Sequence, residues 1–249
     1  MRAVVRSDAG GVRLAQVPDA AVSAPTDAVV RVVLAAVCGT DLWGYRGLGA
    51  IPPGPRAGHE FLGVVEQVGP EVGAIRRGDL VLAPFMWADG SCPPCLDGLP
   101  TSCSQGGMWG GGHDGGQGEA VRVPFADATL IRLPMDERDE RLPAVLALAD
   151  VMATGAHAAA IARVRPGSTV AVVGDGAVGL CAVLAALRAG ARQVVLLGRN
   201  PARTALGTRF GATAIVAERG PAAGERVREL TGGRGADRPS PRQLLLRSD

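Results

Sequence analysis

Three cysteines within one short loop form the densest group of possible metal ligands in the sequence. Cys92, Cys95 and Cys103 lie in the stretch DGSCPPCLDGLPTSC, residues 89–103. A structural zinc site almost always has four tetrahedral ligands, so the loop supplies one sulfur too few. Three interpretations are open: an incomplete zinc site, a thioredoxin-like redox pair in CPPC, or a zinc site with a fourth ligand other than sulfur. The redox interpretation is the weakest, because such a motif should open a helix beside a βαβ unit, whereas this loop is rich in Pro and Gly.

A glycine pattern with the spacing G-x-G-x-x-G is a second chemical signal. GDGAVG, residues 174–179, follows the strand-like run TVAVV and precedes the helix-like run AVGLCAVLAALRAG. In that context it predicts a dinucleotide-binding turn rather than a glycine-rich turn without a ligand. The first glycine permits the tight turn, the second lets the backbone approach a pyrophosphate, and the third lets helix and strand pack closely. The helix N-terminus offers its N–H groups to the phosphates. The predicted cofactor-binding residues of this turn are Gly174, Gly176, Ala177, Val178 and Gly179.

The choice between NAD(H) and NADP(H) should be made at the end of the second strand, in LLGRNPAR. An NAD site usually presents Asp or Glu there to bind the ribose 2′-hydroxyl. This chain has Gly198, which leaves space and removes a repulsive carboxylate, followed by Arg199. Arg199 and Arg203, one turn further on, can pair with a 2′-phosphate. The sequence therefore favours NADP(H) over NAD(H); the alternative is that both arginines are solvated surface residues.

Two further segments contain possible metal ligands. Cys38 lies in VCGTD, and His59 and Glu60 lie in GHEFLGVV. A lone buried cysteine usually just packs, but the longer segments GHEFLGVVEQVGPEV and CGTDLWGYRG resemble the zinc-dependent alcohol dehydrogenases of the medium-chain dehydrogenase/reductase family. With GDGAVG, the resemblance covers residues 1 to about 237, and DGSCPPC and DGGQGE are similar to a bacterial branch. It implies a GroES-like catalytic domain followed by a Rossmann domain.

The resemblance implies a catalytic zinc ion held by Cys38, His59 and Asp150, the last in LADVMATG. Thiolate, imidazole and carboxylate all bind zinc, and three protein ligands leave the fourth position open for water or substrate. Glu60 would coordinate transiently or act from beside the metal. For Asp150 the alternative is an acid that caps a helix or forms a salt bridge.

The same resemblance assigns roles around Cys38 and in the cysteine loop. Asp41 would accept a hydrogen bond from the free ring nitrogen of His59, and Thr40 would carry the hydroxyl that relays the substrate proton. Trp43 stands where some family members have a relay histidine, and we expect it to line the substrate pocket. In the loop, an aspartate holds the place of the family's first cysteine, which implies a structural zinc site with three sulfurs and one oxygen. Its ligands would be Asp89, Cys92, Cys95 and Cys103.

Runs of apolar residues predict an α/β protein with a β-rich N-terminal part. Gly and Pro separate strand-like runs up to about residue 130, Glu140–Val164 is helical in pattern, and strands alternate with helices from Thr169, which argues a parallel sheet. The predicted strands of the first part are Val29–Leu34, Gly63–Val68, Leu80–Ala83 and Ala120–Val123. We expect a GroES-like zinc-binding domain over 1–150, a partial, doubly wound Rossmann domain over 151–237, and a tail outside the family pattern over 238–249.

Composition excludes several classes of function. All 26 basic residues are Arg, so no lysine can act as a base or form a Schiff base, and the net charge of +2 is dispersed, which argues against nucleic-acid binding. No stretch reaches the roughly 18 apolar residues of a membrane helix, and the N-terminus lacks a signal peptide's apolar core, so we expect a cytoplasmic protein. Five cysteines in a reducing compartment suggest metal ligands or core residues. Cys181 is expected in the core, and His113 and His157 at the surface or in caps.

The expected activity is hydride transfer between an alcohol, or the corresponding aldehyde or ketone, and NADP(H) or NAD(H), with zinc as Lewis acid. The tail RPSPRQLLLRSD departs from the family pattern, and only three of the six strands of a cofactor domain can be found. This predicts a truncated or frameshifted member, in which turnover and the family's homo-oligomerisation are doubtful. The alternatives are a catalytically inert remnant that keeps its zinc sites and a zinc-stapled binding module.

Overall fold

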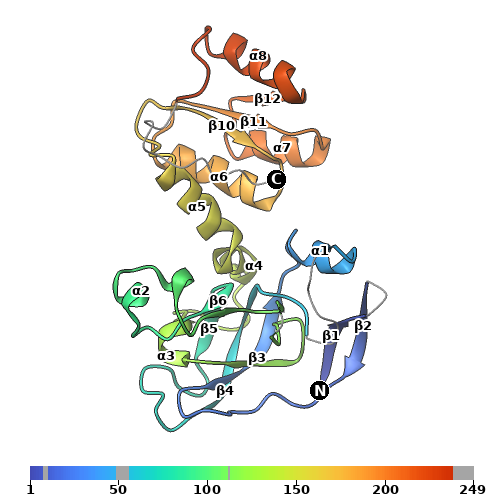
Figure 1. The fold of residues 1–249 in the computed structure, drawn as a ribbon, viewed down its shortest axis with the longest axis vertical. Helices are drawn as coiled ribbons and strands as arrows, with labels where there is room; N and C mark the ends of the chain where they lie inside the picture. Colours follow the sequence, from blue (N-terminus) through green and yellow to red (C-terminus); the bar gives the residue numbers. More distant parts are fainter. Residues whose placement is uncertain (8–10, 49–55, 112, 238–249) are drawn as a thin grey trace. The chain divides into compact units, whose positions relative to one another are not determined.

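Figure 1 shows the computed structural model, which describes residues 1–7, 11–48, 56–111 and 113–237. The chain divides after Asp150 into two compact units, an N-terminal unit of Met1–Asp150 and a C-terminal unit of Val151–Asp249. Each unit has its own sheet and its own hydrophobic core. The predicted tail, 238–249, lies outside the described residues.

The N-terminal unit is built on a five-stranded antiparallel sheet with the strand order β8-β3-β4-β5-β9 (Figure 1). Its strands are β3 (Ala28–Ala35), β4 (Phe61–Val68), β5 (Leu80–Ala83), β8 (Ala120–Val123) and β9 (Ile131–Arg132). The four strands predicted for this part of the chain are confirmed, because β-branched, alternating runs suit a pleated sheet. Two smaller antiparallel pairs are β1 (Arg2–Arg6) with β2 (Val12–Gln16) and β6 (Met86–Trp87) with β7 (Gly107–Met108). The described helices are α1 (Asp41–Tyr45), α2 (Pro93–Leu96), α3 (Ala126–Thr129) and α4 (Leu142–Leu146), with 3₁₀ turns η1 (Pro100–Ser102) and η2 (Ala147–Ala149).

The two faces of this sheet pack against different cores. On β5, Val81 and Ala83 belong to a core that includes Trp109, whereas Leu80 and Leu82 belong to a core formed with α4. This division follows from the two-residue period of a strand. Each fully buried aliphatic side chain stabilises the fold by about 1.5–3 kcal/mol. The strand ends that carry functional side chains are therefore anchored from both faces.

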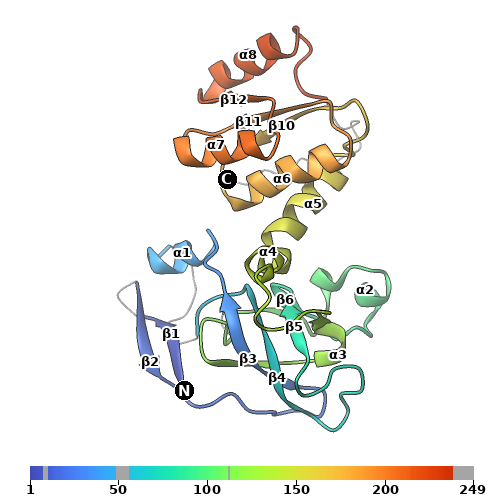
Figure 2. The same cartoon turned by 180° about the vertical axis from the view of Figure 1, so that it is seen from behind.

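The C-terminal unit contains a three-stranded parallel sheet with the order β10-β11-β12. Its strands are β10 (Thr169–Val173), β11 (Gln193–Leu197) and β12 (Ala214–Val216), and its helices are α5 (Val151–Ile161), α6 (Ala177–Arg188), α7 (Pro201–Arg209) and α8 (Gly220–Leu230). Helices α6 and α7 cover one face of the sheet and α8 covers the other (Figures 1 and 2). The predicted alternation of strands and helices is confirmed.

Strand β11 supplies both faces of this sheet. Val194 and Leu196 pack in the core that contains α6, whereas Val195 packs with Ala223 and Val227 of α8. A strand that is buried on both faces reads as a continuous apolar run rather than an alternating one. This is why the run QVVLL predicts a strand correctly.

The helical segment predicted over Glu140–Val164 is interrupted in the structure. It consists of α4, η2 and α5, and the break falls on Asp150, whose φ of −144° and ψ of −71° are not helical. Ala and Leu favour helix on both sides of the break. The carbonyl of Ala149, however, accepts a hydrogen bond from the Phe85 N–H at 3.0 Å, a tertiary contact that local propensity cannot reveal. The interruption leaves Asp150 outside both helices.

No single helix among the described residues is long and apolar enough to cross a membrane. Leu142–Ala149 and Val151–Ile161 reach that length and composition only when they are counted together as a bent pair.

Close packing of β3 against β4 makes Gly63 a point of weakness. A Cβ atom on Gly63 would lie 2.0 Å from the Arg31 carbonyl oxygen, which is backbone and cannot rotate away. We expect Gly63→Ala to lower the free energy of unfolding by about 1–3 kcal/mol or more, the usual cost of overpacking. Chemical denaturation followed by circular dichroism measures this.

Gly73→Ala is the matched control, because the nearest atom to its added Cβ would be a side-chain oxygen of Asp127 at 3.8 Å. A stability of Gly63→Ala equal to that of Gly73→Ala would contradict the close approach of the two strands.

Candidate functional site

Four possible ligands that are distant in sequence meet in the N-terminal unit. Cys38 follows β3, and His59 and Glu60 directly precede β4. Because β3 and β4 are antiparallel neighbours, the end of one lies beside the start of the other. Asp150 reaches the same place from the break after η2. One ligand atom from each of the four residues lies within 4.8 Å of the others.

The distances in this cluster suit a zinc ion. His59 Nε2 lies 3.3 Å from Asp150 Oδ2, and Cys38 Sγ lies 4.0 Å from the same oxygen. In a tetrahedral site with bonds of about 2.0–2.1 Å to nitrogen and oxygen, two such ligand atoms are about 3.3 Å apart. His59 Nε2 and Glu60 Oε1 are buried and make no hydrogen bond. Buried polar atoms are normally satisfied, and one cation among these four groups would satisfy both.

Asp41 connects the histidine to the cysteine. Its Oδ1 lies 3.3 Å from His59 Nδ1, and its Oδ2 accepts a hydrogen bond from the Cys38 N–H at 2.9 Å. A carboxylate behind a ligating imidazole fixes the tautomer so that the other ring nitrogen faces the metal. The structure therefore places Asp41 as the resemblance predicts, and its role there stays a proposal.

Negative charge around one point shifts the pKa values of the cluster. Burial by itself lowers the pKa of His59, but the carboxylates of Asp150 and Asp41 outweigh it and raise the pKa to about 11. Burial, reinforced by Asp150, raises the pKa of Glu60 above its ordinary value. A proton on His59 relieves the charge when no cation is bound. A zinc ion must displace that proton, because imidazole ligates in its neutral form.

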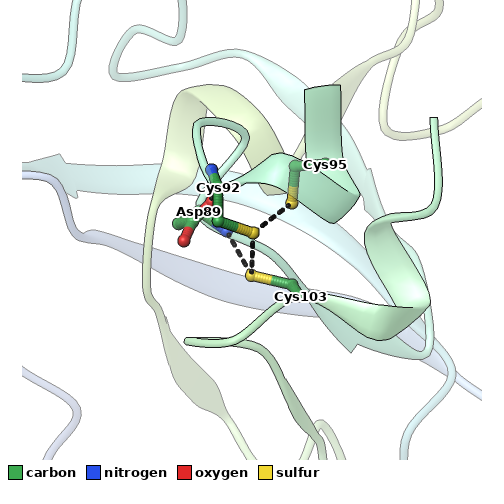
Figure 3. A group of neighbouring side chains, drawn as sticks. All are labelled: Asp89, Cys92, Cys95 and Cys103. Atoms are coloured by element: carbon green, nitrogen blue, oxygen red, sulfur yellow. Dashed lines mark hydrogen bonds between the residues drawn. The ribbon is translucent and has the colours of Figure 1, made fainter. Parts of the chain in front are cut away.

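The second cluster lies in the cysteine loop (Figure 3). Cys92 Sγ lies 3.5 Å from Cys95 Sγ and 3.7 Å from Cys103 Sγ, close to the edge of about 3.8 Å that a tetrahedron with Zn–S bonds of about 2.3 Å has. Asp89 Oδ1 accepts hydrogen bonds from the N–H groups of Ser91 and Cys92 at 2.7 and 2.9 Å. Its other oxygen, Oδ2, is buried and makes no hydrogen bond. The four predicted ligands thus lie together, with one oxygen left for a metal.

Hydrogen bonds set the charge of this second cluster. The N–H groups of Cys92 and Ser91 hold the pKa of Asp89 well below its ordinary value, so its carboxylate is ionised. Burial and the neighbouring thiol of Cys92 raise the pKa of Cys95 to about 12, which means that a second thiolate is hard to form without a cation. A bound zinc ion supplies that cation.

One sequence-based argument about CPPC is corrected by the structure. The motif opens a helix after all, because Cys92 is the N-cap residue of α2. The helix is one turn long, and the neighbouring strands β6 and β7 pair antiparallel, so the βαβ surroundings of a thioredoxin-like pair are not found around it in the described part of the loop. Proximity to Cys103 and Asp89 favours the metal interpretation.

The glycine fingerprint has the geometry of a dinucleotide-binding turn. Gly174 has a φ of +106°, which favours glycine. A Cβ on Gly179 would lie 1.9 Å from the Gly174 carbonyl oxygen, so helix α6 and strand β10 can approach only without one. Gly176, the N-cap residue of α6, faces open space, with no atom within 4 Å of an added Cβ. The N–H groups of Ala177 and Val178, in the first turn of α6, have no partner within the helix and can bind a phosphate.

A residue that sequence reasoning missed lies beside the end of β11. Asp175, inside the fingerprint, accepts hydrogen bonds through Oδ2 from the N–H groups of Arg199 and Asn200, both at 2.8 Å. Its Oδ1 lies 3.8 Å from Arg203 Nη1. A Cβ on Gly198 would lie 2.5 Å from the Asp175 Cβ. Arg203, whose side chain is 58% exposed, thus lies near the outer limit of ion-pair distance from this carboxylate. The available signal was an acidic residue between the first two glycines of the fingerprint, two residues after the end of β10.

Comparison with known proteins agrees with this geometry. The family model of the alcohol dehydrogenase GroES-like domain matches residues 24–135, and that of the zinc-binding dehydrogenases matches residues 177–238. The probable zinc-binding alcohol dehydrogenase of Mycobacterium tuberculosis is 40% identical over 239 residues, which cover 95% of this chain and 60% of that protein. The alcohol dehydrogenase of Thermus sp. ATN1 has a TM-score of 0.85 and 38% identity, over 95% of this chain and 69% of that one. The chain belongs to the zinc-dependent alcohol dehydrogenases of the medium-chain dehydrogenase/reductase family.

The chain spans about three fifths of the length of its Mycobacterium relative. A zinc-binding dehydrogenase from Sinorhizobium meliloti whose structure is bound to NADP has 33% identity and a TM-score of 0.75, over 94% of this chain and 66% of that one. The expected fold class, a GroES-like domain with a Rossmann sheet, is confirmed.

The DGGQGE segment holds the loop before His59 in place. The N–H groups of Gly116 and Gln117 donate hydrogen bonds to the carbonyls of Gly58 and Ala57 at 3.0 and 2.8 Å. A Cβ on Gly116 would lie 2.3 Å from the Phe61 ring. The motif by itself indicates only one branch of the family, and its structural role could not be predicted because its partners are distant in sequence.

The remaining predicted residues lie as follows. Thr40 Oγ1 is 3.9 Å from Cys38 Sγ, near enough to the cluster for the expected proton relay. Trp43, in α1, is 55% exposed, and its place in a substrate pocket stays a prediction. His157 is exposed and Cys181 is half-buried in α6. His113 is exposed and contacts the edge of a tryptophan ring.

Both clusters can be tested by counting metal. We expect about two zinc ions per chain in the purified protein, and about one in each of the variants Cys38→Ser and Cys92→Ser, since each removes one ligand of one site. Cys181→Ser is the matched control and should retain both. Inductively coupled plasma mass spectrometry gives the ratio; a wild-type value near zero would contradict both sites.

Zinc affinity should rise with pH in the neutral range. The raised pKa of His59, about 11, means that the metal-free ring carries a proton at pH 7, and zinc binding must release it. The affinity for the Cys38 site, measured by chelator competition in Cys92→Ser, should increase up to about tenfold per pH unit for each proton released. An affinity that is independent of pH between 6 and 8 would show that the ring is already neutral.

Proposed function

We propose that the chain is a zinc-dependent oxidoreductase that transfers a hydride between an alcohol, or the corresponding aldehyde or ketone, and a nicotinamide cofactor. One observation carries the proposal: Cys38, His59 and Asp150 bring a sulfur, a ring nitrogen and a carboxylate oxygen together at one point. This donor set suits zinc and leaves one position open. Both the family membership and the fingerprint turn support it.

In this proposal Cys38, His59 and Asp150 hold the catalytic zinc, and Glu60 lies beside it. A zinc ion bound there supplies a Lewis acid that lowers the pKa of an alcohol. Asp41 keeps the imidazole of His59 in the correct tautomer.

The proton of the alcohol leaves through the protein. Thr40 carries a hydroxyl that lies 3.9 Å from the Cys38 sulfur, and it would accept the proton and pass it outward. Trp43, exposed on α1, would contact the apolar part of the substrate.

The cysteine loop has a structural role in this proposal. Its first ligand, Asp89, offers the buried, unbonded Oδ2 oxygen, and Cys92, Cys95 and Cys103 offer their sulfurs. A closed site without an open position stabilises the fold and takes no part in the reaction.

The cofactor would bind at the fingerprint of the C-terminal unit, with Gly174, Gly176, Ala177, Val178 and Gly179 around the pyrophosphate. The nicotinamide ring accepts or donates the hydride. NADP(H) is favoured over NAD(H) by Gly198, Arg199 and Arg203, and the Sinorhizobium relative that is bound to NADP supports this choice.

We propose a catalytic domain over 1–150, a cofactor domain over 151–237 and a tail outside the family pattern over 238–249. The five free cysteines suit the reducing cytoplasm.

The zinc-loaded chain should bind NADPH and reduce NADP⁺ in the presence of primary or secondary alcohols. Cys38→Ser should lose at least about a hundredfold in kcat/KM, a usual loss when a catalytic metal ligand is disturbed. His157→Gln, at an exposed position of α5 outside the site, should keep full activity. A zinc-loaded chain that binds NADPH without oxidising any alcohol in a broad panel would favour the inert remnant; zinc loading without NADPH binding would favour the binding module.

A further inference from the structure

The carboxylate of Asp175 lies beside Gly198, the position at which dinucleotide-binding folds recognise the adenosine ribose. In dinucleotide-binding folds the residue at the end of the second strand contacts the ribose 2′-oxygen, and in this chain that position is Gly198. The side chain of Asp175 fills the space beside it, since a Cβ on Gly198 would lie 2.5 Å from the Asp175 Cβ. The carboxylate usually expected on the second strand thus comes from the loop after the first.

The two carboxylate oxygens of Asp175 contact different partners. Oδ2 accepts the N–H groups of Arg199 and Asn200, both at 2.8 Å, and so holds the start of the β11–α7 connection. Oδ1 lies 3.8 Å from Arg203 Nη1, at an ion-pair distance, and keeps capacity to accept a ribose hydroxyl. The N–H of Asn200 and burial pull the pKa of Asp175 in opposite directions, and the net effect lowers it. The group is therefore charged at neutral pH.

We propose that Asp175 is a specificity-determining residue of the cofactor site, which neutralises Arg203 and repels a 2′-phosphate. The preference for NADP(H) over NAD(H) is therefore smaller than Arg199 and Arg203 alone would produce. The inference rests on the proposed function, because it assumes a nicotinamide dinucleotide at the fingerprint. A 2′-phosphate carries nearly two negative charges and competes with Asp175 for the guanidinium of Arg203. The unphosphorylated ribose can instead donate a hydroxyl to Oδ1.

Asp175→Asn isolates the charge, since the amide oxygen can still accept both backbone N–H groups and hold the loop. Isothermal titration of the full chain with adenosine 2′,5′-bisphosphate and with 5′-AMP measures the ribose site without any turnover. We expect the variant to bind the bisphosphate about five- to tenfold more tightly, as the loss of one nearby charge predicts. The affinity for 5′-AMP should fall, because the amide nitrogen that replaces Oδ1 cannot accept the ribose hydroxyl. Glu225→Gln, which removes an exposed carboxylate from α8, should leave both affinities unchanged.

Arg203→Gln tests the same pair from its exposed side, where the side chain is 58% exposed and its replacement does not threaten folding. The variant leaves Asp175 unopposed, so the affinity ratio of bisphosphate to 5′-AMP should fall at least about fivefold. The inference would be overturned if wild type binds both ligands and Asp175→Asn leaves the affinity ratio of bisphosphate to 5′-AMP unchanged. If Asp175→Asn does not fold, an unchanged ratio in Arg203→Gln has the same meaning. Either result leaves the proposed function intact. Wild-type protein that binds neither ligand, nor NADPH, would overturn the proposed function itself.

Discussion

Groups that can carry negative charge surround one buried histidine in the N-terminal unit, and this electrostatic conflict sets the requirements for the rest of the site. Cys38, Glu60 and Asp150 surround His59, whose Nε2 makes no hydrogen bond. Removing a charge from water costs on the order of several kcal/mol per ion, so the cluster is tolerable only with a cation or a proton at its centre. Asp41 lies on the far side of the imidazole, so only one ring nitrogen is available to the metal.

Backbone hydrogen bonds, rather than further side chains, hold the segments that carry these groups in place. The ends of β3 and β4 meet because the strands are antiparallel, and the DGGQGE segment binds the carbonyls of Ala57 and Gly58. The Phe85 N–H donates a hydrogen bond to the carbonyl of Ala149, where η2 ends, one residue before Asp150. All of these backbone contacts lie within the N-terminal unit.

Features that depend on neighbouring residues could be predicted from the sequence, whereas features that depend on contacts between distant residues could not. The fingerprint turn, the strands of the parallel sheet and four strands of the antiparallel sheet follow from local spacing and from β-branched runs, and they are found as predicted. The short strand β9 was not predicted. The interruption at Asp150 could not be predicted, because Ala and Leu favour helix on both sides and the deciding hydrogen bond comes from β5's neighbour Phe85. Asp175 was overlooked for a similar reason, since its partners Arg199 and Asn200 belong to the next strand–helix unit. The loop around Cys92 was expected to lack a helix, but two prolines suffice to begin one turn.

The cysteine loop has almost no interior of its own. Neither α2 nor η1 contains a buried residue, and Leu96 and Leu99 are 75% and 57% exposed. An ion coordinated by Asp89 and three sulfurs would therefore take the place of a hydrophobic core for these residues. Under zinc starvation this segment would be the first to open while the β-sheet beneath it stayed folded, and it would then be a preferred site for cellular proteases. The availability of a nutrient metal would in this way set the lifetime of the chain.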